Sequence, residues 1–361
     1  MPTGERQFLT VANAAYSPNV VALHDSLRRV SRAPFGLRVV CMDRETERLL
    51  QALALPGVTI IPVGDVERFD PGLLDVRDGL TGGRYPLTLK AYGLRYAFER
   101  EPELGMLAFL DADMLFFDDP APMFDELGDA SILLVAHNFH PRWEKTYKFG
   151  PYNGGTVVFR RDPNASAALA CWRDRIHESS FNPHPSGMID QRYLDDWPER
   201  FEGVRVTRHP GIGLTCANSP NFKLEWRNDR PFVEGQPLVF YHYTGHELYR
   251  GVTTLRRLGL FRKDFELVRR PIPLVWGRPW RVELPEELQL WRTYMERLSE
   301  AMAVIREAEP GFRAPFEGRG RDGWRSLAQR KRNRARRRAR RSARAARRVA
   351  GRTAESVGLR R

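Results

Sequence analysis

The sequence lacks three features that would place it in well-known classes of protein. It has only three cysteines in 361 residues, Cys41, Cys171 and Cys216, and their wide separation indicates neither a disulfide framework nor a zinc site. It has no run of about 18 apolar residues, which excludes a membrane-spanning helix. Segment 1–8 lacks the apolar stretch of a secretory signal, so we expect a cytoplasmic protein.

Acidic residues are in the minority overall, but the excess of positive charge is confined to one end of the chain. The net charge is +13, and 18 of the 58 Lys and Arg residues lie in segment 319–361, which has only two acids. The preceding 318 residues therefore have a net charge of −3. The strongly basic character belongs to an Arg-rich tail, so it does not make the whole molecule a nucleic-acid-binding protein.

The sequence does contain enough apolar material for a sizeable core. Hydrophobic residues make up 42% and aromatic residues 11%, which excludes wholesale disorder. Short apolar runs at 7–12, 37–42 and 57–63 indicate strands, with amphipathic helical stretches at 20–30 and 44–55 between them. This alternation predicts a parallel sheet covered by helices.

The same pattern continues through the rest of the chain, as far as residue 308. Two segments are expected to be irregular, a Gly- and Asp-rich loop at 71–83 and a turn around Pro120 and Pro122 that includes Asp118, Asp119 and Asp125. We expect further strands at 106–110, 131–135, 155–159 and 237–242, and further helices at 86–100, 165–178, 190–197 and 285–308.

The most informative feature is a pair of carboxylates, Asp111 and Asp113, between two apolar runs. A charge at the end of a buried strand costs several kcal/mol unless it is paired or coordinated. Divalent ions such as Mg²⁺ and Mn²⁺ take carboxylate oxygens, and ligands bind at the carboxyl ends of parallel strands. The pair therefore indicates a metal site, with a solvated corner after the strand as the alternative.

Segment 109–116 resembles the D-x-D strand of GT-A glycosyltransferases, which transfer a sugar from a nucleotide-diphosphate donor. Further segments resemble, in the same order, motifs of the glycogenin and lipopolysaccharide galactosyltransferase group of retaining enzymes. The resemblance covers about residues 7–250 and implies a GT-A, Rossmann-like fold with a mixed, mostly parallel central sheet flanked by helices. The resembling segments are 10–16, 39–43, 153–159, 190–191 and 239–245.

The resemblance also implies roles for individual residues. Asp111, Asp113 and His242 would hold Mn²⁺ or Mg²⁺, and Asp190 and Gln191 would lie nearest the reacting carbon. A helix N-cap is the alternative role for Asp190, and in an inverting enzyme Asp190 or another carboxylate would serve as the base. The donor-binding residues would be Ala12, Asn13, Tyr16, Lys90, Asp111, Ala112, Asn153, Gly154, Gly155, Gly245 and His246.

Two departures from the family pattern bear on the donor. The group usually has Asp where Asn13 stands. It also usually has Lys-Pro-Trp after the glycine that corresponds to Gly245, and this sequence lacks that motif. Asn can still donate to and accept from a base edge. A UDP-sugar is the favoured donor and retention the favoured outcome. Aromatic and basic residues in the loop 143–152 indicate an acceptor site for a glycan, lipid-linked or cell-envelope substrate.

Three regions are expected along the chain. They are a GT-A domain at 1–270, a C-terminal helical extension at 271–318 packed on or near it, and the Arg-rich tail at 319–361, disordered or an isolated helix. The tail could contact an anionic membrane from the cytoplasmic side, with nucleic acid the less favoured partner. The rival function is a non-catalytic protein, or one that binds a polyanion or nucleic acid, with a degenerate transferase fold and a functional basic tail. A nucleotidyltransferase is discounted because the loop 13–18 has no glycine.

Overall fold

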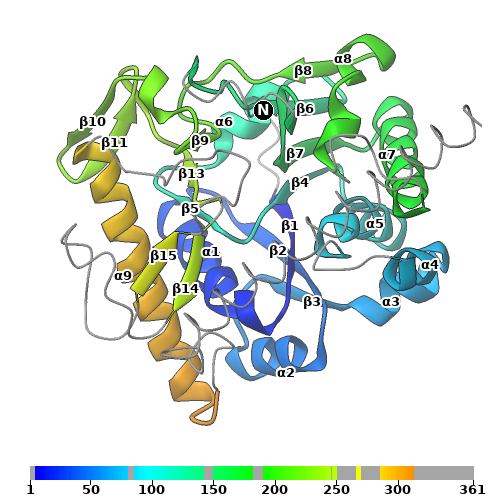
Figure 1. Ribbon diagram of the computed structural model, residues 1–361, viewed down its shortest axis with the longest axis horizontal. Coiled ribbons are helices and arrows are strands. Elements are labelled where there is room, and N and C mark those ends of the chain that lie inside the picture. The colour runs from blue at the N-terminus through cyan, green and yellow to red at the C-terminus, as the bar shows by residue number, and fades with distance from the viewer. Residues whose placement is uncertain are drawn as a thin grey trace, which may run out of the picture.

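The structure is a computed structural model that describes residues 5–79, 85–141, 149–181, 190–244, 246–249, 266–269 and 285–312. Its centre is a seven-stranded sheet in the order β3-β2-β1-β4-β7-β6-β8 (Figure 1). β7 is antiparallel to both of its neighbours, whereas the other pairs are parallel. The strands are β1 (Arg6–Ala12), β2 (Phe35–Cys41), β3 (Val58–Pro62), β4 (Met106–Leu110), β6 (Ile132–Ala136), β7 (Tyr152–Arg160) and β8 (Val204–Val206).

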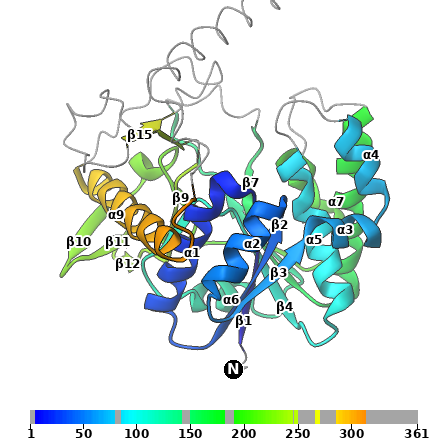
Figure 2. The same cartoon turned by 90° about the horizontal axis from the view of Figure 1, so that it is seen from below.

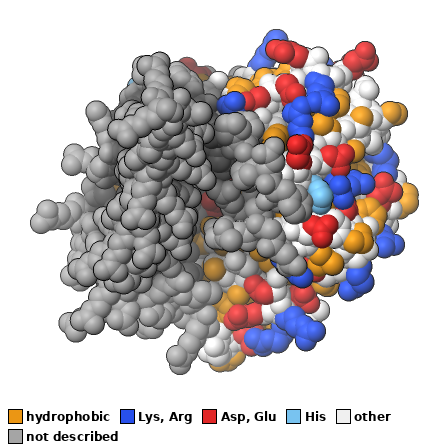
Figure 3. Space-filling view, turned by 45° about the vertical axis from the view of Figure 1, so that its right-hand side comes forward, with side chains coloured by type: hydrophobic (Ala, Val, Ile, Leu, Met, Phe, Trp, Pro, Cys, Tyr) orange, Lys and Arg blue, Asp and Glu red, His pale blue; other side chains and the backbone are white. Residues whose placement is uncertain are grey.

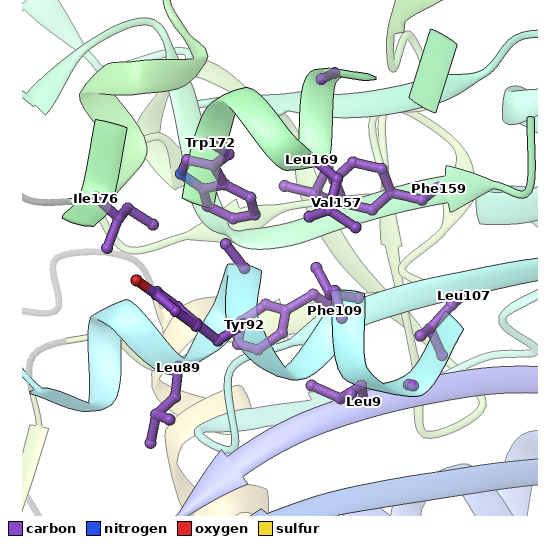
Figure 4. Close-up of a cluster of buried hydrophobic side chains, with 14 of the residues drawn as sticks. Leu9, Leu89, Tyr92, Leu107, Phe109, Val157, Phe159, Leu169, Trp172 and Ile176 are labelled. Carbon is purple, nitrogen blue, oxygen red and sulfur yellow. The ribbon is translucent and has the colours of Figure 1, made fainter. Parts of the chain in front are cut away.

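Helices cover both faces of this sheet, because alternate residues of each strand point to opposite sides. Phe8 of β1 packs with α1 (Ser17–Val30), α2 (Arg44–Leu53) and α6 (Ala121–Leu127). Its neighbour Leu9 packs with the second set of helices on the other face (Figures 2 and 4). That set is α3 (Val63–Phe69), α4 (Gly72–Gly79), α5 (Tyr85–Arg100) and α7 (Pro163–Phe181). The predicted fold class, a mixed and mostly parallel sheet flanked by helices, is confirmed.

A smaller sheet lies beside the central one and brings distant parts of the chain together. β13 (Phe240–His242) is its middle strand, antiparallel to β5 (Met114–Phe116) and parallel to β9 (Leu214–Thr215). The strand that ends in His242 is therefore paired directly with the strand that follows Asp113. Two further small sheets consist of β10 (Leu224–Arg227), β11 (Arg230–Val233) and β12 (Gln236–Pro237), and of β14 (His246–Tyr249) and β15 (Glu266–Arg269).

The long helix α9 (Pro285–Ala308) lies alongside α1 (Figures 1 and 2). Its apolar face recurs at helical spacing, as the sequence predicted. Leu290, Tyr294, Leu298 and Ile305 are buried against Tyr241, Tyr243 and the apolar side chains of α1 and α2. No helix in the described part of the chain is both long and apolar enough to cross a bilayer.

Two segments expected to be irregular are helical instead. In 71–83 the structure has α4, because Leu73 and Val76 lie one turn apart and are both fully buried. In the region of the expected turn it has α6, because Pro122 lies in the first turn of that helix, where a missing N–H costs nothing. Asp119 stays outside α6 and accepts a hydrogen bond from Ala121 N at 2.7 Å.

A third expectation, a single helix over 190–197, is also wrong. The structure has a short 3-10 segment, η3 (Gln191–Leu194), and a separate helix α8 (Trp197–Arg200). Pro198 occupies the first turn of α8, so a new helix starts there and the preceding one does not continue. Two further 3-10 segments, η1 (Ala14–Tyr16) and η4 (Ser219–Asn221), lie in loops.

Candidate functional site

Three segments converge at the carboxyl end of β4. Asp111 and Asp113 follow this strand, Asn153 to Gly155 begin the antiparallel β7, and His242 ends β13. Backbone hydrogen bonds hold the segments together, from Asp111 N to Gly155 O at 2.8 Å and from Tyr243 N to Asp113 O at 2.9 Å. The positions of these side chains are therefore set by the two sheets.

Asp111, Asp113 and His242 form a compact group that could hold a metal ion. One ligand atom of each residue lies within 4.8 Å of the others. His242 Nε2 is 3.1 Å from Asp113 Oδ1 and 3.7 Å from Asp111 Oδ2. The other ring nitrogen, Nδ1, lies 3.3 Å from Asn153 Nδ2, on the side away from the carboxylates.

Lys90 joins this group to Asp190. Its ammonium lies 3.1 Å from Asp111 Oδ1, 3.1 Å from Asp190 Oδ2 and 3.0 Å from the carbonyl oxygen of Gly154. Burial alone lowers the pKa of Lys90, but the two carboxylates outweigh it and raise the pKa above its usual range. Lys90 is therefore a buried cation that three protein acceptors surround.

The charges of the site suit a further cation. Burial raises the pKa of Asp111 even though Lys90 and His242 lie beside it, and the charge of Asp113 adds to the effect. Burial lowers the pKa of His242, but Asp113 and Asp111 outweigh it and raise the pKa. Two neighbouring carboxylates that are removed from water carry a negative charge that a divalent ion would offset.

The two glycines of β7 leave room at the group. A Cβ on Gly155 would lie 2.6 Å from Asp111 Oδ2 and 2.6 Å from His242 Cε1, too close for either. A Cβ on Gly154 would lie 2.8 Å from Gln191 Cβ. A side chain at Gly155 would fill the space in which Asp111 and His242 face one another, and one at Gly154 would collide with Gln191.

The two predicted catalytic residues lie at the same place. Asp190 is buried, and its Oδ1 has no hydrogen-bond partner among the described residues. It precedes η3 but makes no side-chain capping bond, so its carboxylate faces Lys90 and does not cap the helix. Gln191 Nε2 donates to the carbonyl oxygen of Phe149 at 3.0 Å.

The residues expected at the nucleotide base lie at the end of β1 and in the loop after it. Ala12 is buried, Asn13 accepts a hydrogen bond from Ala15 N at 3.1 Å, and Tyr16 is 42% exposed. Asp43 joins this loop to the next one by accepting from Ala14 N at 3.0 Å and from Thr46 N at 2.8 Å. Ala112 is buried between the two aspartates.

Some expectations fall outside the described residues. Gly245 is one, and of His246 only the backbone, at the start of β14, is described. Most of the expected acceptor loop 143–152 and the tail 319–361 also lie outside.

On the face that carries α4, α5 and α7, the described acidic and basic side chains are interspersed (Figure 3).

Sequence reasoning missed His137, which directly follows β6. Its Nδ1 lies 2.9 Å from the carbonyl oxygen of Gly150, and burial lowers its pKa to about 4. The charges of His242 and Asp190 also act on its pKa. A polar residue two positions after the end of the expected strand 131–135 was the available signal.

No protein-family model matches the chain. The chain is similar in sequence to two proteins and in structure to several solved structures. Glycosyltransferases are among these structures. The galactosyltransferase LgtC, solved with donor and acceptor sugar analogs, is 15% identical with a TM-score of 0.49, over 81% of this chain and 95% of that one. Mouse xyloside xylosyltransferase 1 is 14% identical with a TM-score of 0.43, over 67% of this chain and 98% of that one.

The similarity in sequence is to two uncharacterized proteins of Bacillus subtilis strain 168. YfnF is 30% identical over 250 residues, which are 67% of this chain and 82% of YfnF. YfnD is 32% identical over 282 residues, which are 77% of this chain and 83% of YfnD. The matches extend over most of each protein, so the chain belongs to the family that contains YfnF and YfnD.

Proposed function

We propose that this protein is a metal-dependent glycosyltransferase that moves a sugar from a nucleotide-diphosphate donor to a hydroxyl group of an acceptor. One observation carries the proposal: Asp111, Asp113 and His242 converge at the edge of the sheet where the buried pair of Lys90 and Asp190 also lies. This edge is where an α/β sheet binds its ligands.

Asp111, Asp113 and His242 would hold the metal. Two carboxylates and an imidazole fit Mn²⁺ better than Mg²⁺, which prefers oxygen ligands alone. When bound, a divalent cation supplies Lewis-acid stabilisation of the negative charge on a departing diphosphate. The amide Nδ2 of Asn153 contacts the other ring nitrogen of His242.

Asp190 and Gln191 would bind the transferred sugar. Oδ2 of Asp190 is engaged by Lys90, so Oδ1 is the atom left to accept a hydrogen bond from a sugar hydroxyl. Lys90 contacts both Asp190 and Asp111 and would fix their relative position. This would keep the sugar subsite at a constant distance from the diphosphate subsite. Gln191, whose backbone adjoins Gly154, would orient the sugar ring. Retention of configuration remains the favoured outcome.

The loop after β1 would bind the nucleotide. Tyr16 is exposed, so its ring is accessible for stacking on a base. Asn13 and Ala12 would line the base edge, with a UDP-sugar as the favoured donor. The proposed acceptor is a glycan or a lipid-linked substrate, and the Arg-rich tail could bring the enzyme to an anionic membrane surface.

Release of nucleotide diphosphate from a panel of sugar nucleotides tests the proposal. The full chain is assayed with Mn²⁺ and with a chelator, beside Asp113→Ala and the control Asp129→Ala, whose side chain is 94% exposed. We expect release that needs metal, is lost in Asp113→Ala and is kept in Asp129→Ala. If the wild-type chain binds neither UDP nor GDP with Mn²⁺ in calorimetry, the proposal is wrong.

A further inference from the structure

Helix α9 matches none of the glycosyltransferase motifs, yet it contacts the residues beside the metal group. Tyr294 of α9 is fully buried. Its ring stacks on that of Tyr243, with centroids 3.8 Å apart and planes 5° apart. Tyr243 directly follows His242, and its N–H donates to the carbonyl oxygen of Asp113 at 2.9 Å. The ring of Tyr294 therefore packs on Tyr243, which adjoins one candidate ligand in the chain, His242, and is hydrogen-bonded to the backbone of another, Asp113.

The hydroxyl of Tyr294 reaches a second part of the site. It accepts a hydrogen bond of 2.7 Å from Asn19 Nδ2, and both side chains are buried. Asn19 is in the first turn of α1, three residues after Tyr16. One side chain of α9 thus connects the strand that carries His242 to the helix turn that follows Tyr16.

Electrostatics agree with this placement. Burial raises the pKa of Tyr294 well above its usual range, and the charge of Asp113 contributes next. The phenol therefore stays neutral at ordinary pH. Its stacked ring and hydrogen bond leave little freedom for Tyr243 or for the start of α1.

We propose that Tyr294 is a positioning residue of this site, so that α9 is part of the apparatus that binds metal and nucleotide. The ring fixes Tyr243, and through it the spacing of Asp113 and His242. The hydroxyl fixes the first turn of α1, and through it Tyr16. The inference rests on the proposed function, since it assigns Tyr294 to the same metal and nucleotide subsites.

Variants of the full chain separate the two contacts. Tyr294→Leu removes the stack and the hydroxyl, whereas Tyr294→Phe and Asn19→Ala remove only the hydrogen bond. Ile305→Ala is the control, because Ile305 is fully buried on the same face of α9, three turns beyond Tyr294, and belongs to the same core. The measurements are Mn²⁺ binding and UDP binding by calorimetry, and thermal unfolding.

We expect Tyr294→Leu to weaken Mn²⁺ binding by about tenfold, the usual effect of losing a group that orients metal ligands. Tyr294→Phe and Asn19→Ala should keep Mn²⁺ binding and weaken UDP binding by about fivefold each. The double variant Tyr294→Phe/Asn19→Ala should bind UDP as tightly as either single variant, because both substitutions remove the same hydrogen bond. Ile305→Ala should lower the unfolding temperature and leave both affinities unchanged.

The outcomes distinguish this inference from the proposed function. If wild type binds Mn²⁺ and UDP and the Tyr294 variants bind them as Ile305→Ala does, Tyr294 only packs and the inference is overturned. If wild type binds neither, the proposed function fails and the inference fails with it. Should Tyr294→Leu not fold, Tyr294→Phe and Asn19→Ala decide alone.

Discussion

Lys90 and Asp190 form an ion pair in the interior, with Nζ 3.1 Å from Oδ2 and side chains only 4% and 2% exposed. The same ammonium lies 3.1 Å from Asp111 Oδ1. The pair therefore connects the metal group to the residue that we assign to the sugar. The stability of the fold and the proposed function therefore both depend on the Lys90–Asp190 pair.

Replacing Lys90 by Met should destabilise the protein by about 3 kcal/mol or more, because it leaves two carboxylates without their buried cation. Urea unfolding of the metal-free protein at neutral pH measures the change. The control is Lys223→Met, which removes an ammonium that is 72% exposed and should cost less than about 1 kcal/mol. Equal effects of the two substitutions would refute the role of Lys90 as the compensating charge.

Gly155→Ala should weaken Mn²⁺ binding by about tenfold or more, because the ligands would have to move away from the new methyl group. That methyl would lie 2.6 Å from both Asp111 Oδ2 and His242 Cε1. Calorimetric titration with Mn²⁺ measures the affinity, and circular dichroism confirms that the variant is folded. Gly105→Ala is the matched control, because its methyl would have no neighbour within 4 Å. Unchanged affinity in Gly155→Ala would argue against a metal at this position.

His137 should make the protein less stable as the pH falls. Burial lowers its pKa from 6.5 to about 4 in the folded state. Between these values the unfolded chain binds more protons, so this contribution is complete above pH 6.5 and is lost as the pH falls toward 4. The loss amounts to about 3 kcal/mol at most, at about 1.4 kcal/mol for each unit of pKa.

The variant His137→Asn isolates this effect from that of other titrating groups. An amide at this position can still donate to the carbonyl oxygen of Gly150, but it does not titrate. Urea unfolding at several pH values should show a smaller loss of stability in acid for the variant than for wild type. Identical pH profiles would mean that His137 is not held neutral in the fold.

Tyr241→Phe should loosen the attachment of α9 to β13. The hydroxyl of Tyr241 donates to Glu287 Oε1 at 2.6 Å, and both side chains are buried. Losing the donor to a buried carboxylate should cost about 1–3 kcal/mol of unfolding free energy, measured by urea denaturation. Glu287→Gln keeps an acceptor for the same hydroxyl and should cost less. A larger loss in Glu287→Gln than in Tyr241→Phe would contradict this account.

Local patterns in the sequence determined the elements of the α/β unit and the place of the acidic pair. Alternating apolar runs and helical periodicity depend on near neighbours, so the strands that form β1, β2, β3 and β4 could be predicted. Asp111 and Asp113 could be assigned to a strand end for the same reason. The helices α4 and α6 could not be predicted, because their segments contain Gly, Asp and Pro and so have the composition of loops. In α4 the burial of Leu73 outweighs this composition, and in α6 Pro122 is accommodated because it lies in the first turn.

Only the tertiary structure decided which distant residues meet. The pairing of β13 with β5 brings His242 to Asp113, and the packing of α9 on α1 brings Tyr294 to Asn19. Both contacts join segments far apart in the chain, and no local periodicity encodes which surfaces match. Family resemblance could name His242, but it had no motif for α9. The buried position of Lys90 between Asp111 and Asp190 likewise follows from the way α5, β4 and η3 pack, because burial and charge partners belong to the folded chain alone.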